Sequence, residues 1–139
     1  MSTKNKKATF KKFESRKANS KYIRITKDMM ESEAWAKLDV YDTNAYIHFK
    51  SKYYENNRIK TSNEKDISLT YKEMSKAMSS DRYKKSIDNL LEYGFIDIVK
   101  HSPQTRDATI YGLSSRWHDY GNGNFKKASR PKLSRKKNE

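Results

Sequence analysis

The first half of the chain alternates apolar and polar residues in patterns that predict one strand and two helices. Residues 22–26 alternate large apolar with polar side chains, which indicates a short strand. Asp28 is placed to cap a short helix that follows this strand. A second helix, capped by Asp39 or Asp42, is predicted to run to Tyr54, because its large apolar residues fall on one face.

A polar stretch then separates this part from a second set of elements. Residues 55–65 show no periodicity and are rich in turn-forming residues, so we predict a mobile loop. Residues 66–69 are predicted to form a short strand. Thr70 and Glu73 form a T-x-x-E capping box, in which each side chain bonds a free amide of the first helical turn. A helix is therefore predicted from Tyr71.

The next segment predicts a longer helix followed by two strands. Residues 79–81 favour turns and caps, and from Arg82 the apolar residues return at helical spacing until Gly94, which is suited to a left-handed helix end. Residues 95–100 and 108–113 alternate as strands on either side of a polar, proline-containing turn. Two helices joined by a short turn and followed by a hairpin are typical of a helix-turn-helix with a wing.

Composition limits the classes of protein to which the chain can belong. At 139 residues with 34% hydrophobic content, it has room for a single folded domain. With no cysteine it can form neither a disulfide framework nor a thiolate zinc site. We find neither a membrane-spanning apolar run nor the apolar core of a secretory signal, so we expect a cytoplasmic protein with no membrane partner.

The net charge of +14 is concentrated at the two ends of the chain. Residues 1–21 hold eight Lys or Arg against one acidic residue, and residues 114–139 hold eight against two. Residues 22–113 are left with a net charge of +1. We expect a disordered basic arm, a nearly neutral domain and a basic C-terminal extension, an arrangement that favours a polyanion as partner. Lysine-rich tails that only aid solubility are the alternative interpretation.

Two sequence phrases carry a resemblance to a known group of proteins. The phrases ITKDMMESEAWAKL and DISLTYKEMSKAMSSDRYKKSIDNLLEYGFIDI resemble winged-helix proteins of Gram-positive plasmids and prophages over residues 22–113. The resemblance implies an α+β winged helix-turn-helix with four helices, a small antiparallel sheet and a hairpin wing. It also implies double-stranded DNA as partner and a role as replication initiator, regulator or relaxosome accessory protein, working with a relaxase or a replication protein.

The second helix of the motif supplies the first group of candidate DNA contacts. Its apolar residues are expected to face the core, which leaves these positions facing solvent and DNA: Arg82, Lys84, Lys85, Ser86 and Asn89. Arg or Lys can bond guanine, and Asn can bond adenine, in the major groove. Ser79 and Ser80 at the helix start can present hydroxyls and amides to a phosphate. A merely solvated helix face is the alternative, since Asp81 and Asp88 partly cancel the charge.

The wing turn supplies the second group of candidate DNA contacts. Its polar side chains suit phosphates or a narrow minor groove: His101, Gln104, Thr105 and Arg106. Most aromatic residues sit at helical core spacings and are assigned to packing rather than base stacking. The aromatic residues beyond the wing are expected to fold back on the domain: Trp117, Tyr120 and Phe125.

The chain offers no pattern that predicts catalysis, a metal or a cofactor. Its three histidines are far apart in the sequence and lack ligand spacing, and its four glycines form no phosphate loop. We therefore predict a non-enzymatic, sequence-specific DNA-binding protein without a small-molecule ligand, working at a plasmid transfer or replication origin. A transcriptional regulator and a protein-interaction module that binds an acidic partner remain the alternatives.

Overall fold

The computed structural model describes residues 22–56, 61–101 and 109–131, which form a mixed α+β fold. The predicted N-terminal arm therefore lies outside the described residues. The elements, in chain order, are α1 (Lys27–Met30), α2 (Glu33–Ala36), α3 (Val40–Ser51), β1 (Glu55–Asn56), β2 (Thr61–Ser62), α4 (Tyr71–Met74), α5 (Ser80–Glu92), β3 (Ile96–Lys100), β4 (Ile110–Leu113) and the 3-10 helix η1 (Arg116–Asp119).

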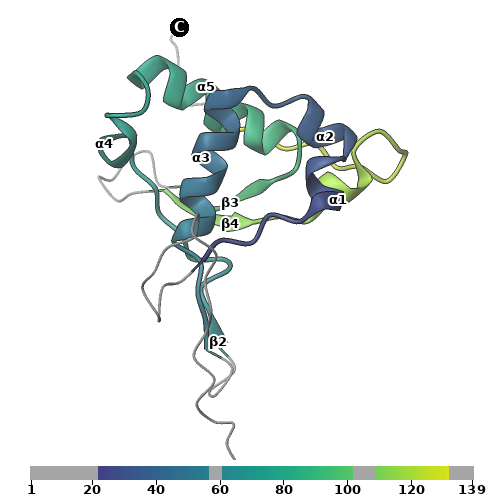
Figure 1. Cartoon of the computed structure of the whole chain (residues 1–139), viewed down its shortest axis with the longest axis horizontal. Helices are drawn as coiled ribbons and strands as arrows, with labels where there is room; N and C mark the ends of the chain where they lie inside the picture. Colours follow the sequence, from purple (N-terminus) through teal and green to yellow (C-terminus); the bar gives the residue numbers. More distant parts are fainter. Residues whose placement is uncertain (1–21, 57–60, 102–108, 132–139) are drawn as a thin grey trace, which may run out of the picture.

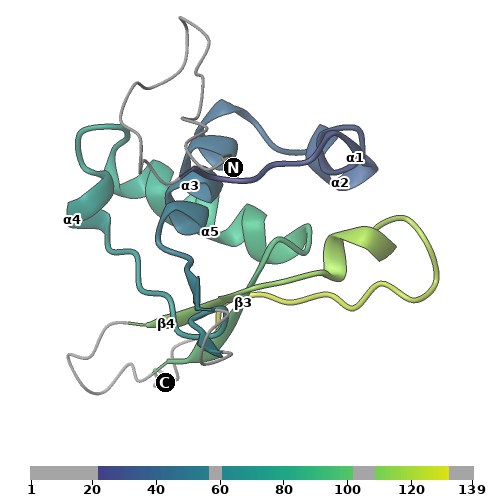
Figure 2. The same cartoon turned by 60° about the horizontal axis from the view of Figure 1, so that its bottom comes forward.

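The helices and the β3–β4 hairpin form the body of the molecule. Helix α3 packs on α5, and the antiparallel hairpin β3–β4 lies beneath them (Figure 1). Helices α1 and α2 lie at one end of this body and α4 at the other, while the small hairpin β1–β2 projects away from it. Figure 2 shows the segment after β4 looping outward beyond η1 and returning beside the β3–β4 hairpin.

The first predicted helix is wrong in its cap and its continuity. Thr26, not Asp28, caps α1, and its hydroxyl accepts a hydrogen bond from the amide of Met29. The helix then stops and α2 begins, because Ser32 accepts from the amide of Trp35 at 3.1 Å while donating to the carbonyl of Met29 at 2.7 Å. This serine therefore divides one expected helix into two, and the described residues contain five α-helices rather than four.

The strand predicted for residues 22–26 is also wrong, since this segment joins no sheet. One edge of β4 is paired with β3, and its other edge is occupied by Ile67, which exchanges backbone hydrogen bonds with Tyr111 at 2.9 and 2.7 Å. Ile67 is also the only residue of the strand predicted at 66–69 that pairs. The polar stretch 55–65, predicted as a loop, contains the hairpin β1–β2.

The caps predicted for α3 and α4 are confirmed. Asp39 accepts hydrogen bonds from the amides of Tyr41 and Asp42 at the start of α3, and Asp42 accepts one from the amide of Asp39. Thr70 and Glu73 form the same reciprocal box at the start of α4. The short-range pattern of these side chains therefore fixes where both helices begin.

The turn between α4 and α5 begins earlier than the turn predicted at residues 79–81, and α5 begins at Ser80 instead of Arg82. Helix α4 ends at Met74, and turns continue to Ser79, whose hydroxyl caps α5 through the amide of Arg82 at 3.2 Å. Helix α5 ends before Gly94, which has a φ of +91°, as expected for a left-handed helix end. A Cβ atom there would lie 2.5 Å from the backbone nitrogen of Trp117, so only glycine fits.

Aromatic side chains form one connected group within the core. Phe95 is the centre of this group, with its ring 5.8 Å from Trp35, 5.4 Å from Tyr46 and 5.9 Å from Trp117. The buried aliphatic residues of α5 pack around it, as the sequence predicted: Ile87, Leu90 and Leu91. The assignment of the helical aromatic residues to packing is therefore confirmed.

Candidate nucleic-acid interface

Helix α5 presents one face to solvent, and two of its predicted DNA contacts lie there. Lys84 and Lys85 are exposed, as are Ser79 and Ser80 at the start of the helix. The Ser79 hydroxyl accepts a hydrogen bond from the amide of Arg82, which stabilises the start of the helix and leaves the hydroxyl proton to be donated to a phosphate. The solvent orientation predicted for the two lysines is confirmed.

Arg82 turns away from that solvent face and binds α3. Its Nη2 atom lies 3.0 Å from Oδ1 of Asp42 and 2.7 Å from Oδ2 of Asp39. Its guanidinium carbon lies 5.0 Å from the centre of the Tyr41 ring, within cation–π range. The side chain of Asp42 is only 1% exposed, so this ion pair joins the two main helices of the core.

Asn89 and Ser86 complete the contact between α5 and α3. The Nδ2 atom of Asn89 donates to Oδ2 of Asp42 at 3.0 Å, and Ser86 is fully buried. The prediction that Arg82, Ser86 and Asn89 face solvent is therefore wrong. For Arg82 and Asn89 the cause is Asp42, whose buried carboxylate needs charged and polar donors, which these two residues of α5 supply at helical spacing. The buried Ser86 hydroxyl has no hydrogen-bond partner among the described residues.

The wing contributes one described candidate residue. His101 is half-buried at the loop end of the β3–β4 hairpin, directly after β3, where its Nδ1 atom lies 2.8 Å from Oγ1 of Thr109. The other wing candidates, Gln104, Thr105 and Arg106, lie outside the described residues.

The segment after β4 packs on the domain, as predicted from its aromatic residues. Trp117 is buried against Phe95, and Tyr120 lies between Tyr93 and Phe125 with ring centres 5.3 and 5.2 Å apart. These edge-to-face contacts join the end of α5 to the C-terminal extension.

Two arginines in the C-terminal extension have partners that the sequence analysis missed, because it counted both only as tail charge. Arg116 donates to Asp97 and to the carbonyls of Leu91, Ile96 and Lys126, at distances of 2.7 to 2.9 Å. Arg130 forms a two-point contact with Asp88, described below. The signal for Arg116 was its position next to Trp117, already expected to fold back. We see no comparable signal for Arg130.

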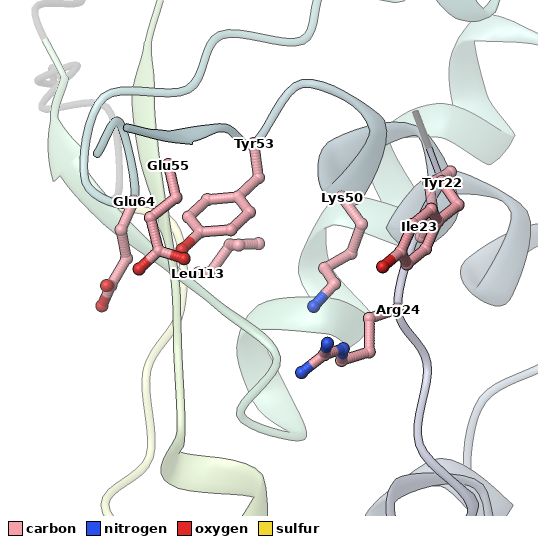
Figure 3. Close-up of a pocket in the computed structure, with 8 residues that line it drawn as sticks. All are labelled: Tyr22, Ile23, Arg24, Lys50, Tyr53, Glu55, Glu64 and Leu113. Atoms are coloured by element: carbon pink, nitrogen blue, oxygen red, sulfur yellow. The ribbon is translucent and has the colours of Figure 1, made fainter. Parts of the chain in front are cut away.

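A hollow of about 440 Å³ opens on another side of the domain, between the N-terminal segment and β1. Figure 3 shows Arg24 and Lys50 side by side on one wall, with Glu55 and Glu64 on the other. Burial lowers the pKa of Lys50, and the charge of Arg24 lowers it further. Because the two carboxylates would repel a phosphate, this hollow does not suit a DNA backbone.

Among the residues that the structure describes, no group of His, Asp or Glu side chains could hold a metal ion. No helix in the same ranges is long and apolar enough to cross a membrane. Comparisons with protein-family models, with curated proteins and with solved structures found no match to this chain.

Proposed function

We propose that this protein binds double-stranded DNA as a winged helix-turn-helix, with α5 in the major groove and the β3–β4 hairpin beside it. The observation that supports this most strongly is the solvent face of α5, where Lys84 and Lys85 are exposed while the opposite face of the helix packs on α3 and the hairpin. A capped helix before it and a hairpin directly after it are the arrangement that winged helices use to bind DNA.

The distribution of charge supports the same function. The basic residues gather in the two terminal regions around a nearly neutral domain, so they would release counterions from DNA and supply affinity without sequence preference. Sequence preference would then come from α5 and the wing. Arg82 and Asn89 are excluded from this proposal as base contacts, because both are held by Asp42.

For the biological process, we propose an accessory role at a transfer or replication origin of a mobile genetic element. This part of the proposal depends on the sequence resemblance stated above. Since the described residues contain no candidate catalytic cluster, nicking or synthesis would come from a partner protein. The position of the recognised sequence within the parent element would separate an origin from a promoter.

The experiment is selection of bound duplexes from a random library at about 0.15 M salt, followed by affinity measurements on the selected and a scrambled duplex. The K84A/K85A variant should lose about tenfold or more on the selected duplex and less on the scrambled one. The matched control is K27A/K37A, which removes two exposed lysines from the region of α1 and α2. Recovery of no motif, or equal losses for both variants, would reject sequence reading by α5.

A further inference from the structure

The solvent face of α5 has the wrong balance of charge for a polyanion. It carries Lys84 and Lys85 near its middle, but also three carboxylates: Asp81, Asp88 and Glu92. Because carboxylates beside a phosphate backbone repel it, this face alone would bind DNA poorly. A nearby source of positive charge is therefore needed.

The C-terminal segment, residues 126–130, lies against two of these carboxylates. The Nε and Nη2 atoms of Arg130 donate to the two carboxylate oxygens of Asp88 at 2.5 and 3.0 Å. Residues 127–129 line a shallow hollow of about 410 Å³ together with Asp88 and Glu92. The segment brings Lys126, Lys127 and Arg130 to the acidic half of the helix and leaves Lys84 and Lys85 exposed.

The upstream end of this segment is also held in place. Arg116 donates from Nη1 to the carbonyl of Lys126 at 2.7 Å. Its guanidinium carbon lies 5.8 Å from the centre of the Phe125 ring, which packs on Tyr120. The segment is therefore fixed at one end by Arg116 and at the other by Asp88, with its two lysines in between.

We propose that residues 126–130 are a third DNA-contacting element beside α5 and the wing, and that Asp88 is the positioning residue that holds them there. This inference rests on the proposed function. The segment changes the charge of the surface from an excess of carboxylates to an excess of cations. Asp88 acts through Arg130, and Lys126 and Lys127 supply the phosphate contacts.

The inference predicts opposite effects for two neighbouring carboxylates. Removing a negative charge from a DNA-binding face ordinarily strengthens binding, and we expect this for D81N, because Asp81 has no ion pair with any described residue. D88N removes the same charge but also releases the basic segment. We therefore expect D88N to weaken binding by about fivefold, because the loss of two phosphate contacts is partly offset by the removal of one repelling carboxylate.

The experiment measures dissociation constants of the full chain, wild type and variant, on the selected duplex at 0.15 M salt. R130Q should weaken binding as D88N does, and the double variant D88N/R130Q should be no weaker than R130Q alone, because both remove the same contact. The D88K change should strengthen binding more in the R130E background than in wild type, since only in D88K/R130E does it restore the ion pair.

A second readout needs no DNA. Trypsin cleavage after Lys126 and Lys127 should accelerate in D88N and R130Q but not in D81N, because only the first two release the segment. If wild type binds no duplex, the proposed function and this inference both fail. If wild type binds but D88N binds as tightly as D81N, or is cleaved no faster than wild type, the inference alone is overturned.

Discussion

Two arginine–aspartate pairs join α5 to other parts of the molecule, and they differ in burial and in consequence. Arg82 reaches from α5 to Asp42 on α3, where the carboxylate is 1% exposed. Arg130 reaches from the C-terminal segment to Asp88 on α5, where the carboxylate is 44% exposed. Of these two pairs, one therefore lies inside the fold and the other on its surface.

Because the two pairs consist of the same residue types and differ in burial, we expect them to have different roles. Asp42 accepts hydrogen bonds from Arg82, Asn89 and the backbone of Asp39, so its buried carboxylate has three donors inside the protein. Asp88 is compensated by Arg130 alone among the described side chains, and water competes for that contact. We expect the inner pair to contribute to stability and the outer pair to hold the C-terminal segment against α5.

The largest effect is expected for D42A. Removing the carboxylate leaves the Asn89 amide without its acceptor and the half-buried Arg82 guanidinium with the more exposed Asp39 as its remaining carboxylate partner, which should cost about 3 kcal/mol of unfolding free energy. Urea denaturation followed by circular dichroism measures this. The matched control is D88A, which removes an equally charged but exposed partner and should change stability far less. Similar losses in the two variants would contradict the comparison.

A smaller but still clear loss is expected for R116A. Its guanidinium connects the end of α5, strand β3 and the C-terminal segment through four partners, and its side chain is only 18% exposed. Leaving the Leu91 and Ile96 carbonyls without this donor should cost about 2 kcal/mol in urea denaturation. R116K keeps the charge but not the several donor nitrogens of the guanidinium. If R116K is as stable as wild type, the multiple hydrogen bonds of Arg116 are not needed.

The sequence predicted the elements that depend on local chemistry. The capping boxes of α3 and α4, the left-handed Gly94 and the core face of α5 follow from spacings within a few residues. What it did not predict depends on contacts distant in sequence. Arg82 and Asn89 are residue types that often contact DNA bases from the exposed face of a helix. Only the packing of α3 on α5 shows that Asp42 binds them.

The same limit applies to the strand and the C-terminal extension. Residues 22–26 have a strand pattern, but the edge of β4 that β3 leaves open is paired with Ile67. Ile67 lies 41 positions after Thr26 in the sequence, so this pairing could not be predicted from local pattern. Arg130 lies 42 positions from Asp88, and its tail composition gave no reason to expect a fixed partner. Aromatic residues were the better guide there, since Trp117 and Tyr120 needed burial whatever their partners were.

The smallest effect on stability is expected for R130A, and this makes the variant useful. An ion pair with both side chains more than 40% exposed should contribute less than about 1 kcal/mol, so R130A should unfold at nearly the same urea concentration as wild type. Weaker DNA binding by R130A could then not be attributed to unfolding. A stability loss comparable to that of R116A would instead show that the C-terminal segment is part of the core, and that the outer pair resembles the inner one.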